Sequence, residues 1–277
     1  MFSTNKSTKI VAVRGESKFV RTLHNIWIIA QRNILLYIRN PVVTLISFVL
    51  PTLLMLMFTA GFAKVVTPGS GYAEYAQFVV PFCIVQGLLM NAVNVGSAFY
   101  DDLHSGMDMR LRIMPIARLS CIGGRLIAAA NNFFFQVAGV VLVGYIIGFR
   151  FQGGLRGILG FFFIPIIFTT SFTLIAMYIA IKVKDAESIS LTMNPWVFPL
   201  TFLSTGYVPQ ESFPLWIQGF VRVNPVSVEV QAMRAFATGN SALSYSLIVF
   251  GCSLSLILIF GTLTVKAYTK IMERSGG

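Results

Sequence analysis

Long apolar runs without a charged residue alternate with charged connections along the chain. The six runs span 42–63, 75–99, 126–149, 157–181, 188–210 and 235–265. A helix needs about 20 apolar residues to cross the hydrocarbon core of a bilayer. All 21 Lys and Arg residues and all 10 Asp and Glu residues lie outside these runs. The pattern predicts an all-α polytopic membrane protein with six transmembrane helices, the fifth interrupted by Asn194, Pro195 and Pro199.

The composition agrees with this class and excludes others. Hydrophobic residues make up 56% of the 277 residues and charged residues 11%, against about 25% charged residues in a soluble domain. The net charge of +11 is spread between the apolar runs and forms no basic domain, which favours contact with membrane lipids and not with nucleic acid. Three cysteines and two widely separated histidines provide neither a disulfide framework nor a set of metal ligands.

The basic residues also predict the orientation of the chain. When the connections are assigned alternately to two sides, one side carries sixteen Lys and Arg residues and the other carries five. Because the basic side faces the cytoplasm, we expect both termini inside, in a plasma (bacterial inner) membrane. The first run begins only at Val42, too late for a signal peptide. We expect a disordered cytoplasmic tail at 1–16, one transmembrane domain at 17–267 and a cytoplasmic tail at 268–277.

Residues 17–40 predict an amphipathic helix before the first span. Apolar side chains, including Trp27, recur at helical spacing on one face, and basic side chains, including Arg32 and Arg39, lie on the opposite face. A helix of this kind lies in the membrane interface, and Pro41 marks a break before the first span. The alternative is an amphipathic helix that packs on another protein.

Residues 100–118 form the longest connection on the cytoplasmic side and carry both signs of charge. Asp101 and Asp102 precede a helix-like stretch, and Arg110 and Arg112 follow near its end, an order that suits the helix dipole. An apolar stripe recurs every four residues, at Leu103, Met107 and Leu111. A short helix with such a stripe is suited to a groove on a partner. The alternative is a solvated loop whose charges only orient the spans.

Residues 207–237, on the outer side, are too charged to span and too apolar to extend freely into water. Pro214 and Pro225 suit the first turns of two short helices, at about 214–222 and 225–237, with Asn224 as the cap of the second. We expect a re-entrant hairpin that buries Trp216, Phe220, Val223 and Met233 in the outer leaflet. Its charged residues should stay near water, namely Glu211, Arg222, Glu229 and Arg234. The alternative is a structured outer loop without a role in transport.

Motifs of catalytic chemistry are missing from the sequence. No Gly-Lys dipeptide occurs, so the chain has no phosphate-binding G-x-x-x-x-G-K-[ST] loop with which to hydrolyse ATP. It also has no G-x-S-x-G or H-E-x-x-H motif, and we assign no catalytic residue, no metal site and no cofactor on this chain. None of the six runs contains a carboxylate or a Lys, which argues against a gradient-driven secondary transporter.

The predicted spans do contain neutral amides. They are Gln86, Asn91 and Asn94 in the second span and Asn131, Asn132 and Gln136 in the third. An unpaired amide in hydrocarbon is costly, so these side chains should face protein or a translocation path. Interhelical hydrogen bonds explain them equally well.

Several short motifs occur in a fixed order along this pattern. They are Arg39-Asn40-Pro41, then Asp102, Gly106, Arg110-Leu111, Pro115 and Arg118, then Ser204 to Pro209, Phe213 to Trp216, Asn224 to Ser227, and Met233-Arg234. Together with six spans, this ordered set resembles the type-2 ABC exporter permeases, specifically the daunorubicin-resistance-like branch. The resemblance extends from about Ser17 to the end of the sixth span.

The resemblance implies a mechanism and partners. Such permeases work as homo- or heterodimers, and each half binds a separate nucleotide-binding ATPase subunit that holds ATP and Mg²⁺. The segment 101–116 would be the coupling helix on that ATPase, with contacts from Asp101, Asp102, Gly106, Met107, Arg110, Leu111, Arg112 and Pro115. The outer hairpin would cap the exit of a path between the two permeases.

The resemblance leaves the cargo open. A hydrophobic or amphipathic drug, antibiotic or lipid is expected, and a polysaccharide or glycolipid is the alternative within the same superfamily. Two further alternatives are a gradient-driven carrier, which would work without an ATPase, and a membrane-embedded enzyme or assembly factor, for which the sequence offers no catalytic group.

Overall fold

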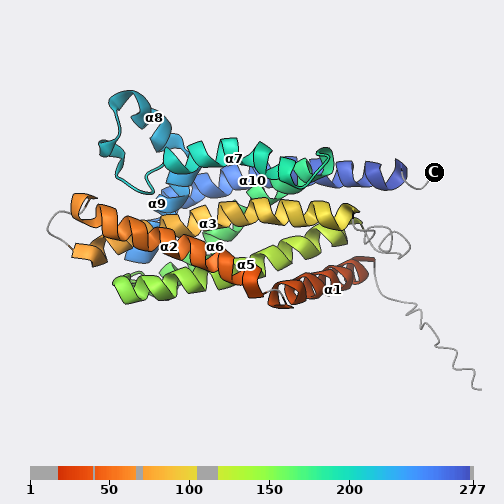
Figure 1. The fold of residues 1–277 in the computed structure, drawn as a ribbon, viewed down its shortest axis with the longest axis horizontal. Coiled ribbons are helices and arrows are strands. Elements are labelled where there is room, and N and C mark those ends of the chain that lie inside the picture. Colours follow the sequence, from red (N-terminus) through yellow and green to blue (C-terminus); the bar gives the residue numbers. More distant parts are fainter. Residues whose placement is uncertain (1–17, 40, 67–70, 105–117, 275–277) are drawn as a thin grey trace, which may run out of the picture.

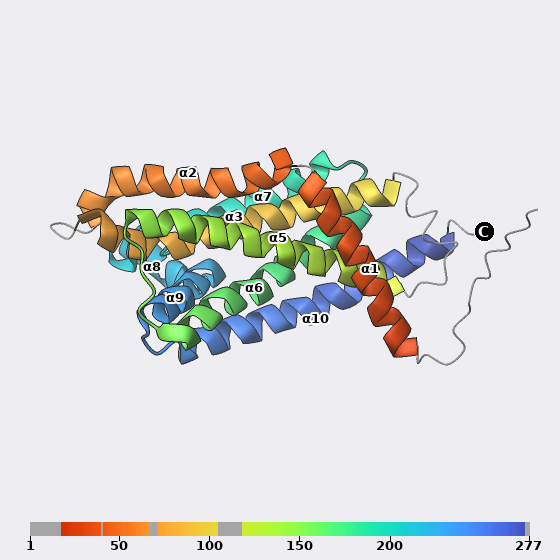
Figure 2. The same cartoon turned by 90° about the horizontal axis from the view of Figure 1, so that it is seen from below.

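The computed structural model describes residues 18–39, 41–66, 71–104 and 118–274. These residues fold into a bundle of helices, without a strand in any of the described ranges. The bundle helices follow its long axis, while α1 (Lys18–Arg39) runs obliquely across one end (Figures 1 and 2). We call this end, with α1, the end of α3 and the start of α5, the α1 end.

One helix, α3 (Gly71–His104), forms the core of the bundle. It packs against α2 (Pro41–Val66), α5 (Arg118–Ile147), α6 (Gly154–Lys182), α7 (Glu187–Phe202) and α9 (Pro225–Thr238). The last long helix, α10 (Leu243–Arg274), packs on α6 and α9, and α1 packs on α5. Apolar side chains that face outward from α2 and α10 remain exposed, as expected where lipid is the solvent.

Five helices are long and apolar enough to cross a membrane. Their apolar parts are Phe48–Val66, Gly71–His104, Ser120–Ile147, Gly154–Lys182 and Leu243–Ile271. They correspond to five of the six predicted runs. The remaining run, 188–210, contains α7, whose 16 residues extend about 24 Å at the usual helical rise, less than the hydrocarbon thickness of about 30 Å. A sixth span therefore stays a prediction.

The predicted limits of the last two spans are wrong. Helix α7 ends at Phe202, and the chain continues through bends and turns instead of a helix that reaches 210. The run 235–265 is divided between α9 and α10. Gly239 has φ of 79° and caps α9 in the left-handed conformation that glycine adopts readily, so an uncharged run is not a continuous helix here.

The opposite end of the bundle, which we call the hairpin end, holds residues 203–242 (Figure 1). It contains the 3₁₀ turn η1 (Gln210–Ser212), α8 (Leu215–Val223) and α9. The two predicted short helices are confirmed within one or two residues. Whether the hairpin enters a leaflet remains a prediction.

Candidate coupling and transport sites

An ion-pair cluster joins three helices at the α1 end. Asp102 lies in the last turn of α3, and its Oδ2 accepts a hydrogen bond from Nη2 of Arg125 on α5. Its Oδ1 lies 3.5 Å from Nη2 of Arg32 on α1. The side chain of Arg125 is only 9% exposed, against 29% for Asp102 and 34% for Arg32. One carboxylate thus neutralises a nearly buried guanidinium and a half-exposed one.

The predicted coupling residues are only partly described. Asp101 and Asp102 lie inside α3, which continues through them to His104. A carboxylate at a helix C-terminus is unfavourable, and the two arginines offset this for Asp102. Six further coupling candidates lie outside the described residues: Gly106, Met107, Arg110, Leu111, Arg112 and Pro115.

Close backbone packing holds α1 against α5. A Cβ added to Gly124 would lie 2.7 Å from Cβ of Ile29 and 3.0 Å from the backbone oxygen of Ile26, so only glycine allows this approach. Trp27 and Arg39 on α1 are exposed. The helix predicted at 17–40 is confirmed, and its place in the membrane interface stays a prediction.

The amides in the predicted second and third spans are not gathered into one path. Asn132 donates a hydrogen bond of 3.3 Å to Asn91, which joins α5 to α3. Gln86 accepts a hydrogen bond of 2.9 Å from the hydroxyl of Tyr207. Asn94 is exposed. For Asn91 and Asn132, the interhelical hydrogen bond that the sequence left as an alternative is observed.

Two other amides differ in their surroundings. Gln136 is buried, and its Nε2 lies so close to Gly87 that a Cβ there would meet it at 2.1 Å. Its Oε1 has no hydrogen-bond partner among the described residues. Asn131 is half-buried. Gly87 therefore makes room for a polar side chain in the middle of the bundle.

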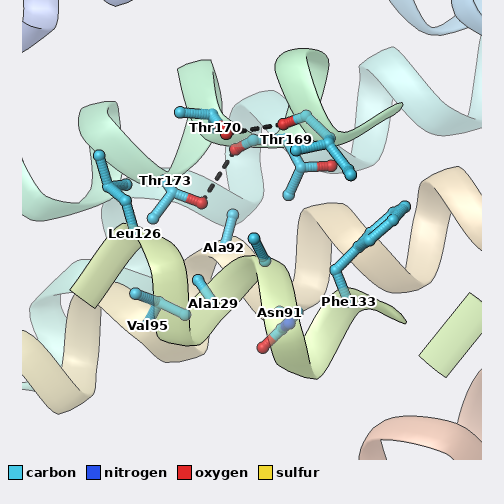
Figure 3. A pocket seen from close by; sticks show the side chains of 11 residues that line it. Asn91, Ala92, Val95, Leu126, Ala129, Phe133, Thr169, Thr170 and Thr173 are labelled. Atoms are coloured by element: carbon cyan, nitrogen blue, oxygen red, sulfur yellow. Dashed lines mark hydrogen bonds between the residues drawn. The ribbon is translucent and has the colours of Figure 1, made fainter. Parts of the chain in front are cut away.

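A small hollow lies between α3, α5 and α6 (Figure 3). Asn91, Thr169, Thr170 and Thr173 contribute polar atoms to its wall. Thr170 and Thr173 donate to the backbone oxygens of Ile166 and Thr169, while Oγ1 of Thr169 is buried without a partner among the described residues. The space suits about one water molecule, which is far too small for a drug or lipid.

At the hairpin end, Asn224 fixes the start of α9. Its Oδ1 accepts a hydrogen bond of 2.9 Å from the backbone N–H of Val226, and Pro225 occupies the first turn. Its Nδ2 donates to the backbone oxygens of Leu200 and Leu203, each at 2.8 Å. The predicted cap is confirmed, and it also ties the hairpin to the end of α7.

The prediction that all charges of the hairpin stay near water is wrong for two residues. Arg234 donates from Nε to the backbone oxygen of Phe78 at 2.9 Å and from Nη2 to that of Gly206 at 3.0 Å. Its guanidinium carbon lies 3.5 Å from the centre of the Phe78 ring. Helix α9, which carries Arg234, packs between α3 and α6. The two hydrogen bonds and the ring contact therefore hold the charge of Arg234 inside the protein.

Glu229 is the second exception. Its side chain is fully buried on α9, and neither carboxyl oxygen has a hydrogen-bond partner among the described residues. Burial raises the pKa of Glu229 to about 8, so the carboxyl is mostly neutral at pH 7. No sequence pattern predicts this burial, because Glu229 lies outside every apolar run.

The remaining predicted hairpin residues are either exposed or buried within the protein. Glu211 and Arg222 are exposed, as predicted. Trp216 is 82% exposed and Phe220 is also exposed, so both are free to contact lipid. Met233 is instead buried within the protein.

A larger apolar cavity of about 450 Å³ lies beside the hairpin. Its wall comes from α6, α9, α10 and the end of α8, and includes Phe168, Val223, Pro225, Val228, Ile248 and Leu256. Sequence patterns could not have found it, because its residues come from distant segments. Among the described residues, no three His, Cys, Asp or Glu side chains gather into a metal site.

Comparison with known proteins identifies a family whose sequence model matches this chain. The sequence model described as "ABC-2 type transporter" matches residues 24–237. The daunorubicin resistance ABC transporter permease protein DrrB1 of Streptomyces coeruleorubidus is 28% identical over 247 residues, which cover 89% of this chain and 85% of the relative.

Two other relatives are also named as permeases. The probable doxorubicin resistance ABC transporter permease protein DrrC of Mycobacterium tuberculosis is 31% identical over 210 residues, 74% of each chain. The putative transport permease ycf38 of Cyanophora paradoxa is 25% identical over 264 residues, 91% of this chain and 90% of the relative.

Proposed function

The chain belongs to the ABC-2 type transporter family, and we propose that it is the transmembrane permease subunit of an ATP-driven exporter. The observation that carries the proposal is the family match over residues 24–237, which extends from α1 to α9. Five apolar helices make it a multi-pass membrane protein. The proposed complex contains a separate nucleotide-binding ATPase subunit, which binds ATP and Mg²⁺, and a second permease subunit.

The proposed orientation places the α1 end in the cytoplasm and the hairpin end outside a plasma (bacterial inner) membrane. The excess of Lys and Arg on the side of both termini supports it. The ATPase then contacts residues 100–118, with Arg110 and Arg112 as charged contacts.

The proposed cargo is a hydrophobic or amphipathic drug, antibiotic or lipid. Relatives named for daunorubicin and doxorubicin resistance support this class. The hollow between α3, α5 and α6 is water-sized, so a cargo of this size would move between two permease subunits and not through this hollow. A polysaccharide or glycolipid is the alternative cargo.

Transport in vesicles tests the proposal. We expect the purified chain to lack ATPase activity until the nucleotide-binding subunit is added, and inside-out vesicles with both subunits to accumulate doxorubicin only with ATP. The double variant Arg110→Glu, Arg112→Glu should keep hydrolysis but lose accumulation, whereas Arg156→Glu, on the opposite side, should transport normally. Normal accumulation by the double variant would refute the coupling contact.

Glu229 favours a second candidate function. A buried carboxyl with a raised pKa is a group that binds protons, which gradient-driven carriers require. On this reading, the chain alone in liposomes would move doxorubicin in response to a pH gradient, and Glu229→Gln would abolish the movement. No movement by the chain alone would leave the exporter as the remaining candidate of the two.

A further inference from the structure

The cluster around Asp102 lies where α3 and α5 approach the predicted ATPase contact. Two residues after Asp102, α3 ends at His104, and Arg125 lies two turns after the start of α5 at Arg118. The hydrogen bond between Asp102 and Arg125 therefore connects the two helices that flank residues 105–117. The second contact, to Arg32, adds α1 to the same junction.

The end of α3 is attached to further elements. The hydroxyl of Tyr100 donates a hydrogen bond to the backbone oxygen of Lys184, between α6 and α7. The guanidinium of Arg125 lies 5.6 Å from the centre of the Phe99 ring, which in turn lies 6.0 Å from the ring of Tyr268 on α10. A displacement of the C-terminal end of α3 would therefore also displace α5, α10 and the segment between α6 and α7.

The two contacts of Asp102 differ in strength. Arg125 is nearly buried, so removal of the Asp102 carboxylate would weaken the neutralisation of a poorly solvated charge. The pair with Arg32 is about one-third exposed on both sides and can separate into water. Asp102 can thus remain attached to α5 while its contact with α1 opens and closes. Asp101 is exposed, so it cannot replace Asp102 in this position.

We propose that Asp102 is a positioning residue that keeps α5 attached to the end of α3 and makes and breaks its contact with α1 during ATP-driven transport. The proposal rests on the exporter function proposed above. It assigns Asp102 to the transmission of movement within the permease and not to direct contact with the ATPase. The proposed role of Asp102 therefore differs from the predicted role of Asp101, which is contact with the ATPase.

A matched pair of variants tests this role in vesicles that contain the full chain and its ATPase subunit. The readout is doxorubicin accumulated per ATP hydrolysed. We expect Asp102→Asn to lower this ratio about tenfold and Asp102→Glu to restore most of it, since the carboxylate returns. Glu187→Gln removes the charge of an exposed carboxylate at the start of α7 and should leave the ratio within about twofold of wild type.

A second pair remains informative even if Asp102→Asn does not fold. Arg32→Gln breaks only the exposed contact and should lower the ratio about threefold, whereas Arg39→Gln on the same helix should not lower it. Equal ratios for Asp102→Asn and Glu187→Gln, or for Arg32→Gln and Arg39→Gln, would overturn the proposal while the exporter function stands. Wild-type vesicles without ATP-dependent accumulation would overturn both.

Discussion

The two ends of the bundle hold their charges in opposite ways. At the α1 end, Asp102 lies between two arginines, and two of the three side chains are about one-third exposed. At the hairpin end, Arg234 is bound by backbone oxygens and an aromatic ring, and Glu229 has no partner among the described residues. A partly exposed ion pair can separate and re-form at little cost, because water solvates both charges. A charge that is removed from water is costly unless its contacts within the protein are kept.

The comparison therefore predicts that charges at the hairpin end contribute more to stability, while charges at the α1 end contribute to movement. Four substitutions test this difference through the free energy of unfolding in mixed detergent, followed by circular dichroism.

Arg234→Met should have the largest effect. It leaves the backbone oxygens of Phe78 and Gly206 without their donors and removes the contact with the ring, so we expect the free energy of unfolding to fall by about 4 kcal/mol. Arg222→Met, at an exposed position on α8, should match wild type. Equal loss from both variants would contradict the contrast between buried and exposed charges of the hairpin.

Glu229 should make stability depend on pH. The folded carboxyl ionises at about pH 8, because its pKa is raised, whereas the unfolded one ionises near the usual 4.5. The folded state binds more protons between these values, so stability should fall by about 3 kcal/mol as pH rises from 5 to 7.5. Glu229→Gln should remove this slope, and Glu211→Gln, which is exposed, should retain it. A wild-type stability that does not change over this window would show that Glu229 has a partner.

Gly124→Ala tests whether packing, more than charge, holds the α1 end together. The new methyl group would meet Ile29 at 2.7 Å, so α1 must shift, and we expect a loss of about 2 kcal/mol. A Cβ added to Gly61 on α2 would have no neighbouring atom within 4 Å. Gly61→Ala should therefore leave the free energy of unfolding unchanged or raise it by up to about 1 kcal/mol. If both variants are equally stable, α1 does not pack on α5 as described.

Arg32→Gln should have the smallest effect on stability. Because its pair with Asp102 is partly exposed, we expect a loss below about 1 kcal/mol at low salt that disappears near 1 M salt. Arg39→Gln gives the comparison without an ion pair. A large loss that salt does not reduce would mean that the cluster is structural, and would weaken its proposed role in movement.

Local patterns in the sequence were enough for much of the fold. Apolar runs predicted the five long helices, because a helix in lipid must expose apolar side chains all along its length. Asn224 followed by Pro225 predicted the start of α9, since capping depends only on neighbouring residues. The same reasoning failed at Gly239, where an uncharged run contains a break between two helices.

The candidate sites were harder to predict. The sequence singled out Asp102 but not its partners, which lie on α1 and α5 and meet it only through helix packing. It placed Glu229 near water because a charged side chain is costly to bury, although α9 lies among α3, α6 and α10. The amides were identified, but the hydrogen bonds that Asn91 and Gln86 form with distant segments became clear only in the folded bundle.

The sequence by itself determined the class of the protein, the position of its apolar helices and their boundaries where a cap marks them. These depend on the transfer of apolar side chains into lipid and on hydrogen bonds between near neighbours. Only the tertiary structure decided which charges are paired, which are desolvated and which amides bond to each other. Those outcomes depend on contacts between residues that are far apart in the chain, and no local pattern records them.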